Sequence, residues 1–333
     1  MKQAVKISLI VAAALILGGI VIGVIGLSKA DWKRKSDDVF ERHELFFPES
    51  DISVIKTDCS SADIKVTANT DDTIKIVYYD SESRRYSVQA SDGLLMVKDK
   101  DNRKWYEFIT PFWVSWQQYE LQISIPGDFR GELEIYNSSG LIDVSGISIS
   151  GSLKLRASSG DIIIDNSSSG GAISAGLSSG SIKISDTGCG GSVEINSSSG
   201  DVFITDLLMD GQLKADLSSG DVSIENITGA GSVTLTSSSG GIRMSGIRAS
   251  SFDIDANSGN IVFADLVPVK SMVLRSSSGN IKGTIDDTIN SFTITSKASS
   301  GDNNLPGSLK LGDIILDVRA SSGDIDISFA DRQ

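Results

Sequence analysis

The sequence predicts an all-β protein, a parallel β-helix preceded by one N-terminal transmembrane helix. Three observations lead to this prediction. They are an uncharged apolar run near the start of the chain, a repeat of about twenty residues over its later two thirds, and an apolar alternation of period two inside each repeat. A fixed repeat of this length indicates a solenoid, and a period of two indicates strands.

Composition excludes several classes of function. The chain of 333 residues has 43 acidic and 30 basic residues and a net charge of -13, so we expect no basic surface for nucleic acid. One histidine, His43, and two cysteines, Cys59 and Cys189, cannot supply a multi-histidine metal site or a disulfide framework. We therefore expect no metal, no cofactor and no catalytic residues, and a scaffold or binding protein rather than an enzyme.

Residues 7–27 form the apolar run and contain no charged residue. As a helix they span roughly 31 Å at about 1.5 Å per residue, which matches a bilayer core. The alternative is a cleaved signal peptide, whose apolar region normally has only about 7 to 15 residues. The run predicts a single-pass anchor in the cell membrane, with residues 1–6 as a cytoplasmic tail. Residues 28–48 are then a juxtamembrane linker, and SDDVFERHEL within it has the pattern of a short helix.

A Ser-Gly pair marks each of ten repeats, spaced by 20 residues five times and then by 19, 20, 22 and 22. Seven residues before the glycine all ten residues are apolar. Five before, two after and four after, nine of ten are apolar, with the exceptions Ser296, Asn303 and Gly283. The repeat glycines are Gly140, Gly160, Gly180, Gly200, Gly220, Gly240, Gly259, Gly279, Gly301 and Gly323.

This pattern places two short strands around each Ser-Gly turn, with one face buried. Equivalent strands then stack in parallel at about 4.8 Å per coil. Residues 131–329 are predicted to form a right-handed β-solenoid of about ten coils. Residues 49–130 are predicted to be a β-rich capping region, in which CSSADIKV at 59–66 is a degenerate first repeat.

The corners have their own predicted geometry. The repeat glycines are expected at positive φ, and the stacked serines are expected to hydrogen-bond backbone groups that the bend leaves free. An acidic residue follows five of these glycines. We interpret these residues as solvated turn residues, with a calcium-binding ladder as the alternative. They are Asp161, Asp201, Asp221, Asp302 and Asp324.

The Ser-Gly motifs resemble a family of bacterial adhesin-like envelope proteins, built around a domain of unknown function with SSGDI-type repeats. The matching segments are SSGDIII at 158–164, SSGDVFI at 198–204, SSGDVSI at 218–224 and SSGDIDI at 321–327. The resemblance implies a β-helix that faces the cell envelope, often behind a membrane anchor, with no established reaction. It favours an extracytoplasmic position for the bulk of the chain, which the flanking Lys and Arg residues alone do not decide.

The leading hypothesis is a membrane-anchored, surface-facing scaffold, adhesin-like or involved in envelope interactions or stress, and not an enzyme. Its expected partners are the membrane, through residues 7–27, and an envelope glycan or protein. One alternative is a polysaccharide lyase or hydrolase, although such enzymes need long loops that build a cleft. Another is a self-polymerising scaffold, because an uncapped last coil would expose unpaired backbone groups.

An aromatic segment, KWYEFITPFWVSWQQY at 104–119, interrupts the pattern before the first full repeat. One hypothesis is a cap whose aromatic side chains pack over the end of the core. The other is an exposed site that contacts the bilayer or stacks on sugar rings. The candidate binding residues are Trp105, Phe112, Trp113 and Trp116.

Replacing Trp113 or Trp116 by Ala separates these two hypotheses. A buried cap predicts a stability loss of roughly 3 to 5 kcal/mol per site. An exposed site predicts an unchanged melting temperature with weaker binding to vesicles or glycans. Thermal unfolding and co-sedimentation with vesicles measure the two effects, and a variant that changes neither would contradict both hypotheses.

Overall fold

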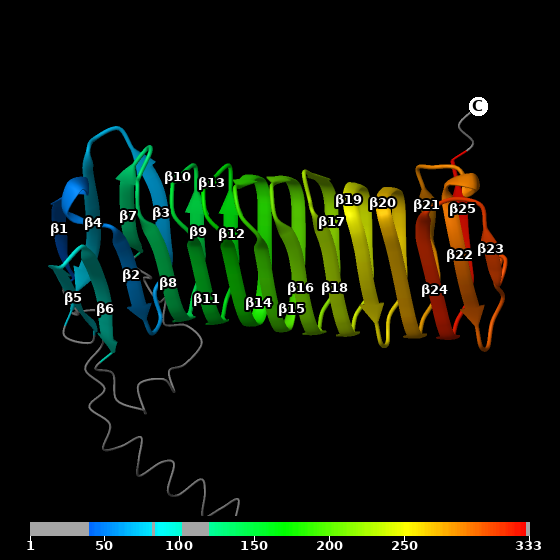
Figure 1. Ribbon diagram of the computed structural model, residues 1–333. Coiled ribbons are helices and arrows are strands. Elements are labelled where there is room, and N and C mark those ends of the chain that lie inside the picture. Colours follow the sequence, from blue (N-terminus) through cyan, green and yellow to red (C-terminus); the bar gives the residue numbers. More distant parts are fainter. Residues whose placement is uncertain (1–39, 82–83, 102–119, 331–333) are drawn as a thin grey trace, which may run out of the picture.

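The computed structural model describes residues 40–81, 84–101 and 120–330, which form an elongated rod of stacked β-coils (Figure 1). The two helices among these residues are the short 3-10 turns η2 (Glu49–Asp51) and η4 (Ile289–Ser291). Neither is long and apolar enough to cross a membrane. The predicted tail 1–6, the predicted transmembrane segment 7–27 and most of the predicted linker lie outside the described residues.

The rod is a parallel β-solenoid, as the repeat predicts, and it has about nine turns where about ten were expected. One complete coil shows its plan, with three straight sides formed by β11, β12 and β13. In the next coil Leu153 lies beside Ile173 and Ile162 beside Ile182, a register of twenty residues. The central strands are β8 (Glu132–Ser139), β9 (Ile142–Ser145), β10 (Ser148–Ile149), β11 (Leu153–Ser159), β12 (Ile162–Asp165), β13 (Ser168–Ser169), β14 (Ile173–Cys189), β15 (Val193–Met209), β16 (Gln212–Ser219), β17 (Val222–Thr228), β18 (Ser232–Ser239) and β19 (Ile242–Ala256).

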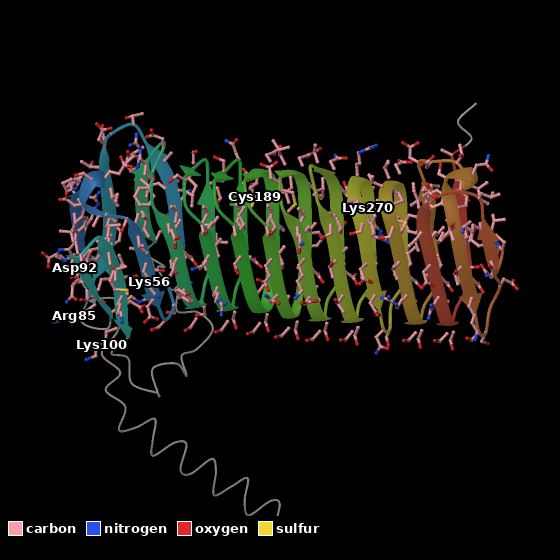
Figure 2. All side chains as sticks on the ribbon, viewed as in Figure 1. Lys56, Arg85, Asp92, Lys100, Cys189 and Lys270 are labelled. Atoms are coloured by element: carbon pink, nitrogen blue, oxygen red, sulfur yellow. The ribbon has the colours of Figure 1, made fainter. Side chains whose placement is uncertain are left out.

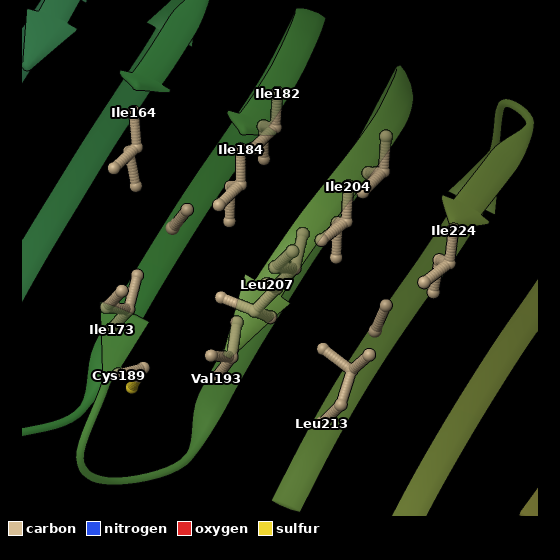
Figure 3. Packing of buried hydrophobic residues seen from close by; sticks show 14 of the residues in the cluster. Ile164, Ile173, Ile182, Ile184, Cys189, Val193, Ile204, Leu207, Leu213 and Ile224 are labelled. Carbon is tan, nitrogen blue, oxygen red and sulfur yellow. The ribbon is translucent and has the colours of Figure 1, made fainter. Parts of the chain in front are cut away.

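The core is a continuous column of apolar side chains inside the coils. Equivalent residues line up along the axis, as Ile164, Ile184, Ile204 and Ile224 do in Figure 3. All four are buried. Burying one such side chain contributes about 1.5 to 3 kcal/mol to the stability of the fold. Each coil is therefore held mainly by the packing of its aliphatic side chains against those of its two neighbours.

The repeat glycines are required for two reasons. A Cβ at any of the ten would come closer than 3.0 Å to the carbonyl oxygen stacked against it in the neighbouring coil. Six of them also have φ between 112° and 154°, which confirms the predicted positive φ for those six. The six are Gly140, Gly160, Gly180, Gly220, Gly301 and Gly323.

The acidic residues after these glycines hold the coils together. Asp221 donates its backbone N–H to Asp201 Oδ1 at 2.9 Å, and Gly241 donates its own to Asp221 Oδ1 at 2.7 Å. Asn260 Oδ1 accepts in the same way from the N–H of Asn280, at 2.8 Å. An amide oxygen therefore does the same work as a carboxylate oxygen. Among the described residues no group of His, Cys, Asp or Glu is arranged to hold a metal ion, so nothing here favours the calcium ladder.

A third corner, which the sequence prediction missed, lies between the second and third sides of the coil. Its residue takes the left-handed conformation at φ between 45° and 68°. The short polar side chains of Asn and Asp tolerate this conformation better than other non-glycine residues. The residues are Gly146, Asn166, Asp186, Asp206, Asn226, Gly246 and Asp265.

The N-terminal end confirms the degenerate repeat. Ala62 occupies the place of the repeat glycine and stacks against Gly140, and Asp63 Oδ1 accepts the N–H of Leu141 at 2.9 Å. The coil β2–β3 lies between the coil β8–β9 and an outer layer of β6 and β7. The strands of this end are β1 (Glu41–Pro48), β2 (Val54–Cys59), β3 (Ile64–Asn69), β4 (Thr73–Asp80), β5 (Arg84–Ser91), β6 (Leu94–Asp101) and β7 (Leu121–Pro126).

The predicted short helix in SDDVFERHEL is wrong over residues 41–45, because they belong to strand β1. This strand pairs in antiparallel register with β4 over its whole length. His43 stacks on Tyr78 with ring centroids 5.1 Å apart. Tertiary pairing with an apolar strand therefore overrides the local helical pattern, and the capping region begins before residue 49.

At the C-terminal end the order of the coils in space differs from their order in sequence. Met272 pairs with Leu316, and Leu316 also pairs with Ile294, so β24 lies between β20 and β22. Strand β23 then pairs in antiparallel register with β22 on the outside. The strands are β20 (Ile261–Ser278), β21 (Ile281–Ile285), β22 (Phe292–Ala298), β23 (Ser308–Lys310), β24 (Ile314–Ser322) and β25 (Ile325–Phe329).

The prediction of an uncapped last coil is therefore wrong. The last repeat in the sequence is paired on both sides, and the ninth repeat forms the end of the rod. The ninth repeat has polar residues, Ser296 and Asn303, at two core positions. At the end of the rod both of them form hydrogen bonds. Asn303 Nδ2 donates to Ser296 Oγ at 2.8 Å, and Ser296 Oγ donates to the carbonyl of Pro306 at 2.9 Å. Among the described residues, β23 and not the last coil of the sequence is therefore the outermost strand at this end.

The Asp and Asn residues that directly follow the repeat glycines form one row along the rod, the Asp/Asn row, and this row leads to a stability prediction. Asp221→Ala removes the acceptor for the N–H of Gly241 and is expected to destabilise the rod by about 0.5 to 1.5 kcal/mol. Asp221→Asn keeps an acceptor oxygen and is the matched control, with little expected change. Chemical denaturation measures both. Equal losses in the two variants, or a calcium-dependent rise in melting temperature that Asp221→Asn abolishes, would contradict the role of the oxygen as a backbone acceptor.

Candidate functional site

A shallow groove of about 770 Å³ runs along the rod beside the Ser-Ser-Gly corner. It crosses the side of the coil formed by β11 and its equivalents, over strands β2, β8, β11, β14, β15, β16 and β18. Figure 2 shows the side chains around the rod, with Lys56 near the N-terminal end from which the groove starts. The groove is open and its lining is mixed: outward-facing strand residues and exposed corner serines line it together with inward-facing residues such as Asn137 and Leu177.

Two of the rows that line the groove face outward, with one residue per coil in each row. Successive residues in a row are about 4.8 Å apart, since they lie on neighbouring strands. The corner row consists of six exposed serines, Ser138, Ser158, Ser178, Ser198, Ser218 and Ser238. The strand row consists of Tyr136, Arg156, Gly176, Asn196, Asp216 and Thr236.

The hydroxyls of the corner row have no hydrogen-bond partner among the described residues. The prediction that the stacked serines bond the backbone at the bend therefore fails for this row, whereas other serines of the motif, such as Ser139, do bond a backbone carbonyl. That role belongs to the Asp/Asn row, and to inward-facing serines such as Ser197 and Ser237, whose hydroxyls donate to the carbonyls of Gly200 and Gly220. The six exposed hydroxyls remain able both to donate and to accept a hydrogen bond from a ligand.

Gly176 forms a notch in the strand row. Its neighbours in the adjacent coils are Arg156 and Asn196. A Cβ on Gly176 would meet only Arg156 Cγ, at an ordinary distance of 3.6 Å. The backbone therefore does not require glycine here. Within the described part of the chain Arg156 has no ion-pair partner, so its guanidinium is available beside the notch.

The carboxylates near the groove are already paired. Lys56 and Lys154 hold Glu134 at 2.9 and 3.0 Å, and the hydrogen bonds from Lys56 and then Lys154 lower the pKa of Glu134. Glu134 and Lys154 are register partners on neighbouring strands and form an ion pair between two coils. Lys214 is the register partner of Glu194, but its ammonium group lies 2.8 Å from Asp216 on its own strand. The groove is thus close to neutral.

The two cysteines are free and buried. Cys59 lines the start of the groove, and burial, followed by the nearby charge of Asp99, raises the pKa of its thiol to about 12. Burial also raises the pKa of Cys189. Cys59 is paired in register with Asn137 on the first side of the coil, whereas Cys189 lies on the third. At both positions burial disfavours the thiolate, which is the nucleophilic form of cysteine.

The sequence prediction placed the candidate site elsewhere. Trp105, Phe112, Trp113 and Trp116 lie outside the described residues, so the choice between cap and exposed site stays a prediction. The serine row was visible as the residue two before each repeat glycine, but the sequence gives no sign of which hydroxyls the fold leaves unpaired.

The comparison with curated proteins gives no match. Among solved structures, a candidate lipid-binding protein from Parabacteroides distasonis is 15% identical, with 87% of this chain and 97% of that chain covered and a TM-score of 0.40. A candidate cell-adhesion protein from Clostridium sporogenes has 10% identity, coverage of 88% and 100%, and a TM-score of 0.19. A candidate adhesin from Bacteroides fragilis has 13% identity, coverage of 86% and 97%, and a TM-score of 0.34.

With TM-scores this low, these three likenesses carry no argument about function. The family model is informative, because its two matches, over residues 52–245 and 204–333, together span the whole solenoid and the capping region from residue 52 onward. They confirm the resemblance found in the SSGD motifs. The chain belongs to the Toastrack DUF4097 family.

Proposed function

We propose that this protein is a non-enzymatic envelope scaffold whose serine groove binds an extended, hydroxyl-rich glycan chain. Residues 7–27 anchor it in the cell membrane, and the solenoid lies outside the cytoplasm. The observation that supports the proposal best is the row of six exposed, unpartnered hydroxyls along the groove.

The repeat of the groove suits a polymer. Six rungs at about 4.8 Å extend over roughly 24 Å, and each rung offers the same hydroxyl to the same side. A glycan chain is also a repeat of hydroxyl-bearing units, so one unit after another can make equivalent hydrogen bonds. A near-neutral groove favours such a chain over a strongly charged ligand, and many weak contacts along a polymer add to a useful affinity.

The position of the carboxylates supports binding rather than hydrolysis. Asp58 and Asp216 line the groove but lie five rungs apart, because Asp58 is paired in register with Tyr136 and four coils follow. That separation is about 24 Å. The two carboxyl groups of a glycosidase lie only about 5 to 9.5 Å apart. The groove therefore lacks the convergent acid and base that the lyase or hydrolase alternative needs.

Protease shaving of intact cells tests the proposed position of the rod. A chain with an epitope tag after residue 333 should lose the tag when protease is added outside, while a cytoplasmic control protein stays intact. After lysis both should be cleaved. Protection of the tag in intact cells, with cleavage only after lysis, would place the rod inside and overturn the surface scaffold.

Filling the notch tests the groove. Gly176→Gln places a side chain between Arg156 and Asn196 in space that the backbone tolerates, so the rod should fold. Binding to purified peptidoglycan glycan strands should fall at least tenfold. Ser223→Gln, on the outer surface of the second side of the coil, is the matched control and should bind as the unmodified protein does. Co-sedimentation measures the binding, and equal binding by Gly176→Gln and the control would exclude this groove as the site.

A further inference from the structure

The last coil of the chain, residues 314–329, fills a slot between two other coils. On one side β24 and β25 pair with β20 and β21, and on the other side β24 pairs with β22. Its inward side chains are buried, with Leu316 and Val318 at 0% exposure. The two walls of the slot come from residues 271–285 and 292–304, which precede the coil in sequence.

Polar contacts also join this coil to both walls. Asp326 lies 3.0 Å from Lys282 on one wall and accepts a hydrogen bond from Asn304 on the other, at 3.3 Å. The N–H of Asp324 donates to Asn280 Oδ1, and Asp324 Oδ1 accepts the N–H of Asp302, both at 2.9 Å. The slot therefore offers polar partners to the coil at both positions, and position 324 needs a side-chain oxygen that accepts a backbone N–H.

Residues 311–313 are the covalent link between the coil and the rest of the cap. They cross from β23, on the outer edge of β22, to β24 on its inner edge. Leu311 and Gly312 both donate their N–H groups to the carbonyl of Phe292 at 3.0 Å. A Cβ on Gly312 would come closer than 3.0 Å to the backbone of Ser291, so the crossing is tight.

We propose that residues 314–329 exchange between two copies of this chain, so that the coil of one copy fills the slot of the other. Each contact that the coil makes within its own chain is available unchanged in a second copy. The two arrangements therefore differ mainly in the link, and short, tight links favour exchange. A link of three residues spans at most about 11 Å, so the exchanged pair meets at the C-terminal caps. This inference is independent of the proposed glycan groove.

Cysteine cross-linking of the full chain in detergent tests the exchange. Val273 and Asp317 are register partners on the exposed side of β20 and β24, a separation that a disulfide can bridge. Val273→Cys protein is mixed with Asp317→Cys protein, incubated and mildly oxidised. The expected result is a disulfide-linked dimer containing both variants, at least tenfold more abundant than in a mixture of Thr234→Cys with Asp317→Cys. Thr234 on β18 is not a partner of Asp317 in either arrangement.

The double variant Val273→Cys/Asp317→Cys is the positive control, because its disulfide forms within one chain. If that disulfide forms but the mixed single variants give no dimer, the exchange is overturned. A longer link gives a second test: inserting Gly-Ser-Gly-Ser after Gly312 should relieve the tight crossing and lower the dimer yield severalfold. An unchanged or higher yield with the longer link would contradict the role assigned to residues 311–313.

Discussion

The structure depends on one close approach of backbone to backbone. At each Ser-Ser-Gly corner the next coil lies so near that a side chain on the glycine would meet a carbonyl oxygen. The glycines therefore have to stack on one another, and this sets the register of every other row. A slip by one residue would bring a side chain against a carbonyl and turn the apolar residues outward. The apolar column, the Asp/Asn row and the serine row all follow from that single alignment.

The residues that hold adjacent coils together and the residues that present hydrogen-bonding groups to solvent lie in different rows along the rod. Inward aliphatic residues and the Asp/Asn row hold adjacent coils together, whereas the exposed hydroxyls of the corner serines have no partner within the described structure. Because contacts in a solenoid are made mainly with nearest neighbours, a change in one coil affects two interfaces and leaves the others intact. A row that does not contribute to cohesion is free to vary in chemistry without loosening the rod.

Much of the fold could be predicted from the sequence, because the signal repeats ten times and local errors average out. The parallel coils, the core positions and the degenerate repeat at 59–66 follow from periodicity. The third corner was missed since Asn, Asp and Gly alternate there without one fixed letter, as at Asn166 and Asp186. The C-terminal order was missed although Ser296 and Asn303 marked it. Two polar residues at core positions are tolerated best in a coil at the end of the rod. The order of the repeats in the sequence nevertheless predicted that the ninth coil stacks between the eighth and the tenth.

The candidate site could be predicted only in part. Periodicity locates the serines, but which hydroxyls remain unpaired depends on how the corner turns, and only three-dimensional coordinates give that. In the capping region the local pattern of residues 41–45 favoured a helix, and pairing with β4 outweighed it.

The layered ends have a consequence for how such a chain can change in length. At the N-terminal end β6 and β7 lie outside the coil β2–β3, and at the C-terminal end β24 lies between β20 and β22. Duplicating an end coil would therefore break the pairing of a neighbouring strand. The central coils have no such constraint, because each one stacks on the next in sequence order. A tandem duplication of twenty residues between β11 and β18 adds one rung and leaves both caps unchanged. Evolution can therefore adjust the reach of the rod by copying its middle, while its two ends are inherited as fixed units.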